Sequence, residues 1–131
     1  IPSRLIVVVV IVPAGNLSCA PAHKHDPVTP VVESKLEEVY YFQTAVDRGL
    51  PEPKLSDPTG FFRGYKSDGR AFDVTTEVRS GDVVLIPHGW HGPVMATPGY
   101  DLYFLNVMAV EYSTTSLNFG EGNTPFSDSV N

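Results

Sequence analysis

Residues 71–110 have the sequence AFDVTTEVRSGDVVLIPHGWHGPVMATPGYDLYFLNVMAV, and this stretch decides the fold class. Runs of β-branched and aromatic residues alternate in it with turn clusters rich in glycine and proline, and no helical period is sustained. The pattern extends toward the N-terminus, so the predicted strands cover residues 5–12, 22–25, 37–44, 61–65, 71–78, 82–86, 92–96 and 100–110. Short strands at this spacing predict an all-β protein, either a closed barrel or a double sheet.

The size and charge of the chain limit its class. With 131 residues it is long enough for one domain, and we expect a core over about residues 4–110 and a C-terminal extension over 111–131. The formal net charge is −6 and no basic stripe is present, which argues against nucleic-acid binding. Cys19 is the single cysteine and has no intrachain partner, which fits a reducing compartment; we expect a cytoplasmic protein.

An apolar run, LIVVVVIV, occupies positions 5–12. It is far shorter than the roughly 20 residues that cross a bilayer. The turn-forming residues of Pro13–Asn16 end it directly. We therefore predict a buried strand and its turn, not a signal peptide, and no contact with a membrane.

Three histidines are candidate metal ligands. His23 and His25 flank Lys24 in PAHKHD, so on a strand the two imidazoles share one face and Lys24 points to the other. His91 lies just after the turn Pro87–Gly89, far along the chain. Zinc and other first-row divalent ions bind neutral imidazole readily. These histidines therefore predict a site for a divalent cation.

A carboxylate from the next strand completes the candidate site. Glu38, in LEEVYY, shares a strand face with Tyr40, whereas the competing carboxylate Glu37 faces the other way. Glu38 is the preferred ligand because its face also carries Tyr40 and Phe42, which suit a barrel interior. The predicted ligand set is His23, His25, Glu38 and His91.

These residues resemble the two motifs of the cupin superfamily, an HxH pair with a later glutamate and a G-x5-P-x-G…H element. The interval from His25 to Glu38 is longer than usual, and the interval from Gly89 to His91 is shorter. Within that superfamily, PAHKHD, LEEVYY, GDVVLIPHGWH and GYDLYFLNVMA together resemble the C-terminal half of the 5-deoxy-glucuronate isomerase family. The resemblance runs from about Arg4 to Ala109 and fades after Val110.

The resemblance carries expectations about fold and activity. It implies a cupin double-stranded β-helix (a jelly-roll barrel) and makes residues 1–131 one cupin domain, the second half of a two-cupin protein. It places the metal ligands of the family on the same four residues. It also implies an aldose–ketose isomerase of myo-inositol catabolism that converts 5-deoxy-glucuronate, a sugar acid, to 2-deoxy-5-keto-gluconate with Zn, Mn, Fe, Ni or Co.

Proton transfer between carbons and oxygens needs an acid/base group near the metal. Tyr40 is predicted to face inward beside Glu38 and is one candidate. Asp101 and Tyr103 share a face of the strand over 100–110 and are the others, with Asn106 on the opposite face. Tyrosines in barrels also serve as packing residues with a solvated hydroxyl, so this alternative stays open.

Other polar residues are candidates for the substrate or the barrel mouth. Arg63 or Arg79 could bind the substrate carboxylate through a bidentate pair, although arginines on strands often face solvent. His88, in a turn, is expected at the surface or mouth, and Trp90 is expected to pack at the barrel rim. The loop over 48–57 could cover the mouth, and Ser67–Arg70 is predicted to be a hairpin turn.

Two other functions fit the same ligands. One is a cupin dioxygenase or oxidase that uses iron or manganese, and the other is a non-catalytic sugar-binding cupin. Unpaired strand edges would also favour a homodimer.

Overall fold

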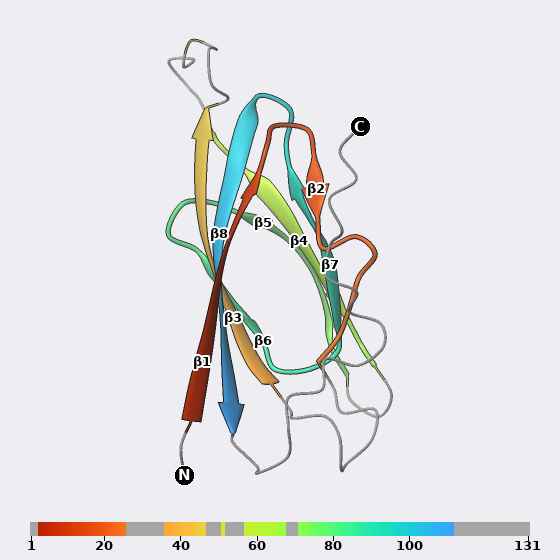
Figure 1. Ribbon diagram of the computed structural model, residues 1–131. Helices are drawn as coiled ribbons and strands as arrows, with labels where there is room; N and C mark the ends of the chain where they lie inside the picture. Colours follow the sequence, from red (N-terminus) through yellow and green to blue (C-terminus); the bar gives the residue numbers. More distant parts are fainter. Residues whose placement is uncertain (1–2, 26–35, 47–50, 52–56, 68–70, 112–131) are drawn as a thin grey trace, which may run out of the picture.

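The fold consists of two four-stranded antiparallel sheets that face each other (Figure 1). The computed structural model describes residues 3–25, 36–46, 51, 57–67 and 71–111. The first sheet has the order β1 (Ser3–Val12), β8 (Tyr100–Glu111), β3 (Leu36–Val46) and β6 (Val83–Ile86). The second has the order β2 (Leu17–Ser18), β7 (Trp90–Ala96), β4 (Gly60–Tyr65) and β5 (Asp73–Val78). The all-β prediction is confirmed, and none of the described segments forms a helix able to span a bilayer.

The strand predicted over residues 22–25 is wrong. Only His23 pairs there, in an isolated bridge to His91. Two backbone hydrogen bonds hold the bridge, from His23 N to His91 O at 3.1 Å and from His91 N to His23 O at 2.9 Å. Pro21 cannot donate to a ladder, which limits pairing on the N-terminal side. The two-residue strand β2 was not predicted, because so short a segment has no readable period.

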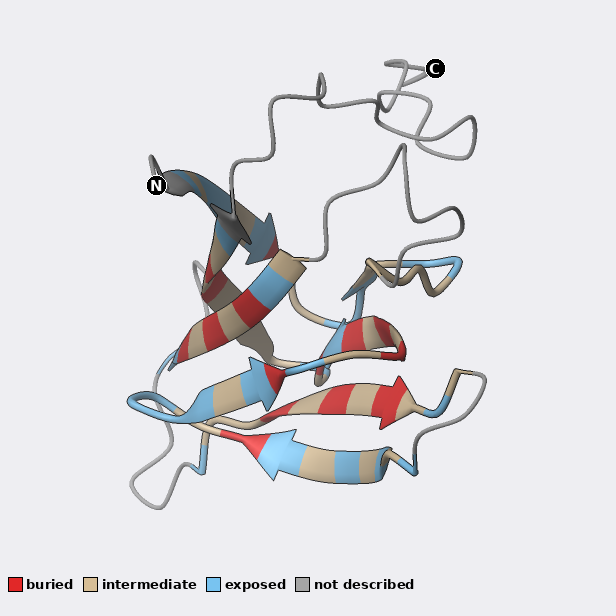
Figure 2. Cartoon of the chain, turned by 90° about the horizontal axis from the view of Figure 1, so that it is seen from below, coloured by how far each residue is buried: buried red, intermediate tan, exposed pale blue. Residues whose placement is uncertain are grey.

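The core lies between the sheets and is rich in aromatic side chains. Along β3, buried and more exposed residues alternate, as Figure 2 shows for several strands. Tyr40 stacks on Phe104 with ring centroids 4.8 Å apart, and Phe42 and Phe62 contact Tyr40 edge-on. Smaller apolar residues fill the remaining space: Val12, Val78, Ile86, Val94, Ala96 and Leu102. Because the period is two, this core fixes which face of β3 points inward.

Strand β1 corrects the expectation of a buried strand over 5–12. It lies at an edge of its sheet, and within the described chain its strand partner is β8. Val12 is buried, but Leu5, Val7, Val9 and Ile11 are exposed. The run is apolar on both faces, so its composition could not show that one face is uncovered.

Two predicted loops fall largely outside the described residues. Positions 68–70 of the predicted hairpin turn are not described, although β4 and β5 do pair as an antiparallel hairpin. The same holds for most of the loop over 48–57 and for the extension beyond residue 111.

Candidate metal centre

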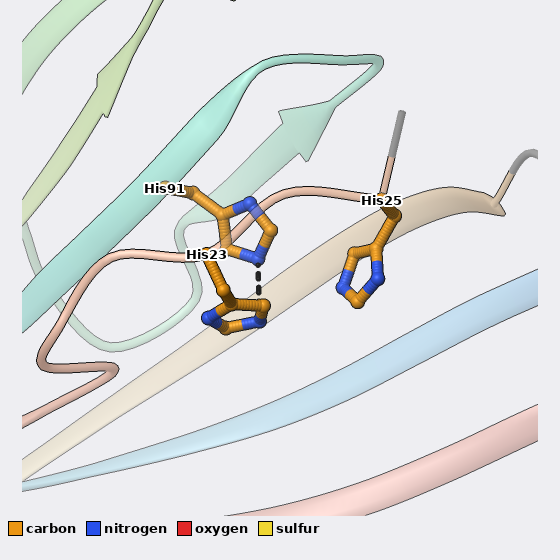
Figure 3. Close-up of side chains that lie close together, drawn as sticks. All are labelled: His23, His25 and His91. Carbon is orange, nitrogen blue, oxygen red and sulfur yellow. Dashed lines mark hydrogen bonds between the residues drawn. The ribbon is translucent and has the colours of Figure 1, made fainter. Parts of the chain in front are cut away.

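Three imidazoles from two distant parts of the chain converge at one point (Figure 3). One ligand nitrogen from each of His23, His25 and His91 lies within 4.8 Å of the other two. His91 is fully buried at the start of β7, and its Nε2 lies 3.0 Å from His23 Nε2. The backbone bridge between His23 and His91 fixes this approach. The two histidines before β3 therefore converge without forming a strand.

The carboxylate of Glu38 lies against the same nitrogens. Its Oε2 is 3.0 Å from His91 Nε2 and 3.4 Å from His25 Nε2, and the residue is 2% exposed. Glu38 lies on the face of β3 that also carries Tyr40 and Phe42, whereas Glu37 is exposed on the other face. The structure thus brings the four predicted ligands together and leaves the competing carboxylate outside.

Several buried nitrogen and oxygen atoms of the cluster lack a hydrogen-bond partner among the described residues. Within the described part of the chain, His25 Nε2 and both carboxylate oxygens of Glu38 have no hydrogen bond of ordinary geometry. Buried polar atoms are normally paired, since leaving one unpaired costs about 1–3 kcal/mol. The unpartnered Oε2 of Glu38 lies within 3.4 Å of imidazole nitrogens of both His25 and His91. Three imidazoles and one carboxylate in this arrangement fit a first-row divalent ion.

The protonation states of the cluster also suit a cation. Burial, together with His91 and His25, lowers the pKa of His23 to about 4, so its imidazole is neutral at pH 7. Burial alone would raise the pKa of Glu38, but the nitrogens of His25 and His91 outweigh it and lower the pKa to about 2. Metal ions bind neutral imidazole and ionised carboxylate, and His23 and Glu38 have these forms at neutral pH.

A glycine lets the segment that leads to His23 approach β7. Gly92 has a φ of +112°, and a Cβ built on it would lie 2.1 Å from the carbonyl oxygen of Cys19. Only a residue without a side chain permits this contact. The backbone between β2 and His23 can therefore lie directly on β7 beside His91.

Tyr40 is the predicted acid/base residue that faces the cluster. Its ring meets that of His91 edge-on at 6.0 Å, and its hydroxyl lies 3.7 Å from Cys19 Sγ. Burial, followed by the charge of Glu38, raises the pKa of Tyr40 well above its ordinary value. The phenol therefore keeps its proton at physiological pH and can donate a hydrogen bond.

The structure does not bring Asp101 and Tyr103 to the cluster. They share one face of β8, as expected, but Leu102 and Phe104 show that the opposite face is the inner one. Asp101 Oδ1 instead accepts a hydrogen bond of 2.9 Å from the backbone of Ala14, at the turn after β1. Period-two alternation places a polar pair outside whenever its apolar neighbours fill the core.

The two arginines are also engaged elsewhere. Arg63 contacts Asp73 and donates to the carbonyl oxygens of Gly64 and Val74. Arg79 forms a bidentate pair with Asp57, at 2.8 and 2.7 Å, and lies 2.8 Å from Glu77. Both are partly exposed, and their surface ion pairs hold them away from the inner face.

The aromatic residues around the turn pack against one another. His88 is half-buried against Phe72, with ring centroids 5.6 Å apart, so it is less exposed than predicted. Trp90 stacks on Tyr65 at 6.4 Å, and Lys24 Nζ lies 5.2 Å from the indole centroid. Lys24 thus points to Trp90.

Asn106 is an inner-face residue that sequence reasoning did not select. It is 9% exposed and lies opposite Tyr40 in the pairing of β3 with β8. Its Oδ1 is buried without a hydrogen-bond partner among the residues described. The alternation of Leu102, Phe104 and Asn106 was the sequence signal that could have identified it.

Comparisons with known proteins identify relatives of the chain. The model of the KduI/IolB family matches residues 2–121. The chain is 46% identical over 105 residues to a 5-deoxy-glucuronate isomerase of Geobacillus thermodenitrificans, covering 80% of this chain and 34% of that protein. It is 39% identical over 109 residues to the one of Listeria innocua, covering 83% and 36%. The chain therefore spans about a third of the length of these curated relatives.

A solved structure is similar as well. An IolB-like protein from Salmonella typhimurium LT2 superimposes with a TM-score of 0.66 and 36% sequence identity. The match covers 93% of this chain and 42% of that one. The two-sheet architecture described above is thus shared with a relative of known structure.

Proposed function

This chain belongs to the KduI/IolB family, and we propose that it is the metal-binding cupin domain of a 5-deoxy-glucuronate isomerase. The reaction would convert 5-deoxy-glucuronate to 2-deoxy-5-keto-gluconate, an aldose–ketose isomerisation. The convergence of three histidines on the buried carboxylate of Glu38 is the observation that carries the proposal. Relatives that bear this name are 38–47% identical to the chain over 105–109 residues, which supports the same reading.

His23, His25, His91 and Glu38 are the residues that would hold the ion, which we propose to be Zn, Mn, Fe, Ni or Co. When bound, a divalent ion supplies Lewis-acid polarisation of a sugar carbonyl and its neighbouring hydroxyl. Tyr40, which keeps its proton, would donate a hydrogen bond to a substrate oxygen. Asp101, Tyr103, Arg63 and Arg79 are left out of the proposed site because their side chains are engaged outside it or face away from it.

The test is turnover of the metal-loaded chain with 5-deoxy-glucuronate, followed by NMR. We expect conversion to the ketonate without oxygen uptake. Glu38→Gln removes a charged ligand and should lower the rate by about 100-fold or more, whereas Glu37→Gln, on the exposed face of the same strand, should leave it unchanged. Oxygen consumption would support the dioxygenase alternative. No conversion, or an equal loss in both variants, would contradict the isomerase proposal.

We also propose Asn106 as a substrate contact, since its buried Oδ1 lies on the inner face beside Tyr40 without a partner among the described residues. An unpaired buried acceptor costs about 1–3 kcal/mol, so Asn106→Leu should preserve or raise the free energy of unfolding. The same change should lower kcat/KM roughly 10- to 100-fold, because a substrate hydroxyl loses its acceptor. Urea unfolding and steady-state kinetics measure the two effects. A stability loss with unchanged kinetics would show a structural role instead.

A further inference from the structure

Lys24, which lies between two of the histidine ligands in the sequence, contacts the single tryptophan of the chain. His23 and His91 form an antiparallel bridge, so the next opposed pair in that register is Lys24 with Trp90. The Nζ atom of Lys24 lies 5.2 Å from the centroid of the indole, within the range of a cation–π contact. His91 is fully buried, whereas Trp90 beside it is half-buried on the other face of β7. The two segments therefore meet through imidazoles on one side and through an ammonium and an indole on the other.

Neighbouring strands of the second sheet hold the indole in place. Trp90 pairs with Tyr65 across β7 and β4, and the two rings stack with centroids 6.4 Å apart and an interplanar angle of 14°. The guanidinium carbon of Arg63 lies 5.2 Å from the centroid of the Tyr65 ring, and Arg63 also contacts Asp73 on β5. A row of cation–aromatic contacts thus links β5, β4 and β7 to Lys24. The lysine therefore contacts a ring whose own position is fixed by the sheet.

The backbone attachment of the ligand segment to β7 is centred on His23. Two hydrogen bonds form it, and both join the backbones of His23 and His91. His25 lies two residues beyond these bonds, and its Nε2 lies 3.4 Å from Glu38 Oε2 in the cluster. Because Lys24 lies between His23 and His25, a contact of its side chain with β7 restricts the movement of both ligands.

We propose that Lys24 is a positioning residue for the metal centre, and that its contact with Trp90 holds His23 and His25 where they can bind the ion. This inference rests on the metal site of the proposed function. Charge alone would give Lys24 the opposite effect, because an ammonium group near a divalent cation repels it. A contact that orders the ligands in advance instead strengthens binding, since less ordering is left for the ion to impose. The two roles therefore predict changes of opposite sign in metal affinity when the charge of Lys24 is removed.

The test is the affinity of the whole chain for Zn²⁺, measured by competition with a chromophoric chelator. Lys24→Met keeps the length and the apolar stem of the side chain but removes the cation, and it should weaken Zn²⁺ binding by about two- to fivefold. Lys24→Arg retains a cation that stacks on aromatic rings, so it should bind Zn²⁺ as the parent chain does. Lys66→Met is the matched control, because Lys66 is exposed just after β4 and its loss removes the same charge. This control should not weaken binding.

A double-mutant cycle shows whether the effect of Lys24 depends on the indole. In a Trp90→Leu background, Lys24→Met should cause no further loss of affinity, because the ring is already absent. Circular dichroism would verify that each variant keeps its β-structure. Unchanged or tighter Zn²⁺ binding in Lys24→Met would overturn the positioning role and leave the metal site intact, as would an equal loss in both backgrounds or in Lys24→Arg. A parent chain that binds no Zn²⁺ would instead contradict the metal site itself, and with it this inference.

Discussion

Replacing His91 with alanine should abolish stoichiometric binding of a divalent ion. His91 is fully buried, and its Nε2 lies 3.0 Å from both His23 Nε2 and Glu38 Oε2, so it occupies the middle of the cluster. Loss of outer hydrogen-bond partners of metal ligands already costs roughly 10–100-fold in affinity. Loss of a central ligand should therefore weaken binding by more than about 100-fold. Metal content after dialysis and titration calorimetry would measure it.

His88→Ala is the matched control for this prediction. His88 lies three residues earlier, in the turn before β7, but its ring packs on Phe72 and is not part of the cluster. The control should therefore bind metal as the parent chain does. His25→Ala removes a less buried ligand and should lower affinity in the same direction without disturbing the core. Unchanged stoichiometry in His91→Ala would show that the ligand set is wrong.

The strand face of Glu38 could be predicted because one rule determines it. In LEEVYYF, alternate positions carry Tyr40 and Phe42, and large aromatic residues at period two indicate the inner face. The convergence of His23 and His25 could be predicted too, but the strand that was expected to produce it does not exist. The isolated β-bridge between His23 and His91, and the close approach of the Cys19 backbone to Gly92, position these histidines instead. Such long-range contacts leave no local periodicity to read.

Asp101 and Tyr103 show where residue chemistry is a misleading guide to a site. Their side chains can transfer protons, but Leu102 and Phe104 beside them already indicate that the buried face of β8 is the other one. Asn106 shares that buried face and has no titratable group, so a search for acid/base residues passes over it. The exposure of β1 could not be predicted at all, since an unbroken run of valine and isoleucine has no polar residues to mark an outer side.

Gly92→Ala should be the most destabilising small substitution at the site. The new Cβ would lie 2.1 Å from the carbonyl oxygen of Cys19, which is a backbone atom and cannot rotate away. Its φ of +112° adds conformational strain for any residue with a side chain. Overpacking and strain each cost about 1–3 kcal/mol, so the free energy of unfolding should fall by about 3 kcal/mol or more. Urea unfolding would measure the change.

Gly99→Ala separates the clash from the strain, because Gly99 has a φ of +89° and, apart from its two chain neighbours, no atom of the described residues lies within 4 Å of the place that an alanine methyl would take. This control should lose only about 1–2 kcal/mol. If the two variants lost equal stability, the contact with Cys19 would not be the cause.

The clash at Gly92 has a second consequence, for the metal site. To relieve the clash in Gly92→Ala, the segment between β2 and His23 must move away from β7. This movement would break the His23–His91 bridge. Gly92→Ala should therefore also weaken metal binding, whereas Gly99→Ala should not, even though neither glycine offers a ligand atom.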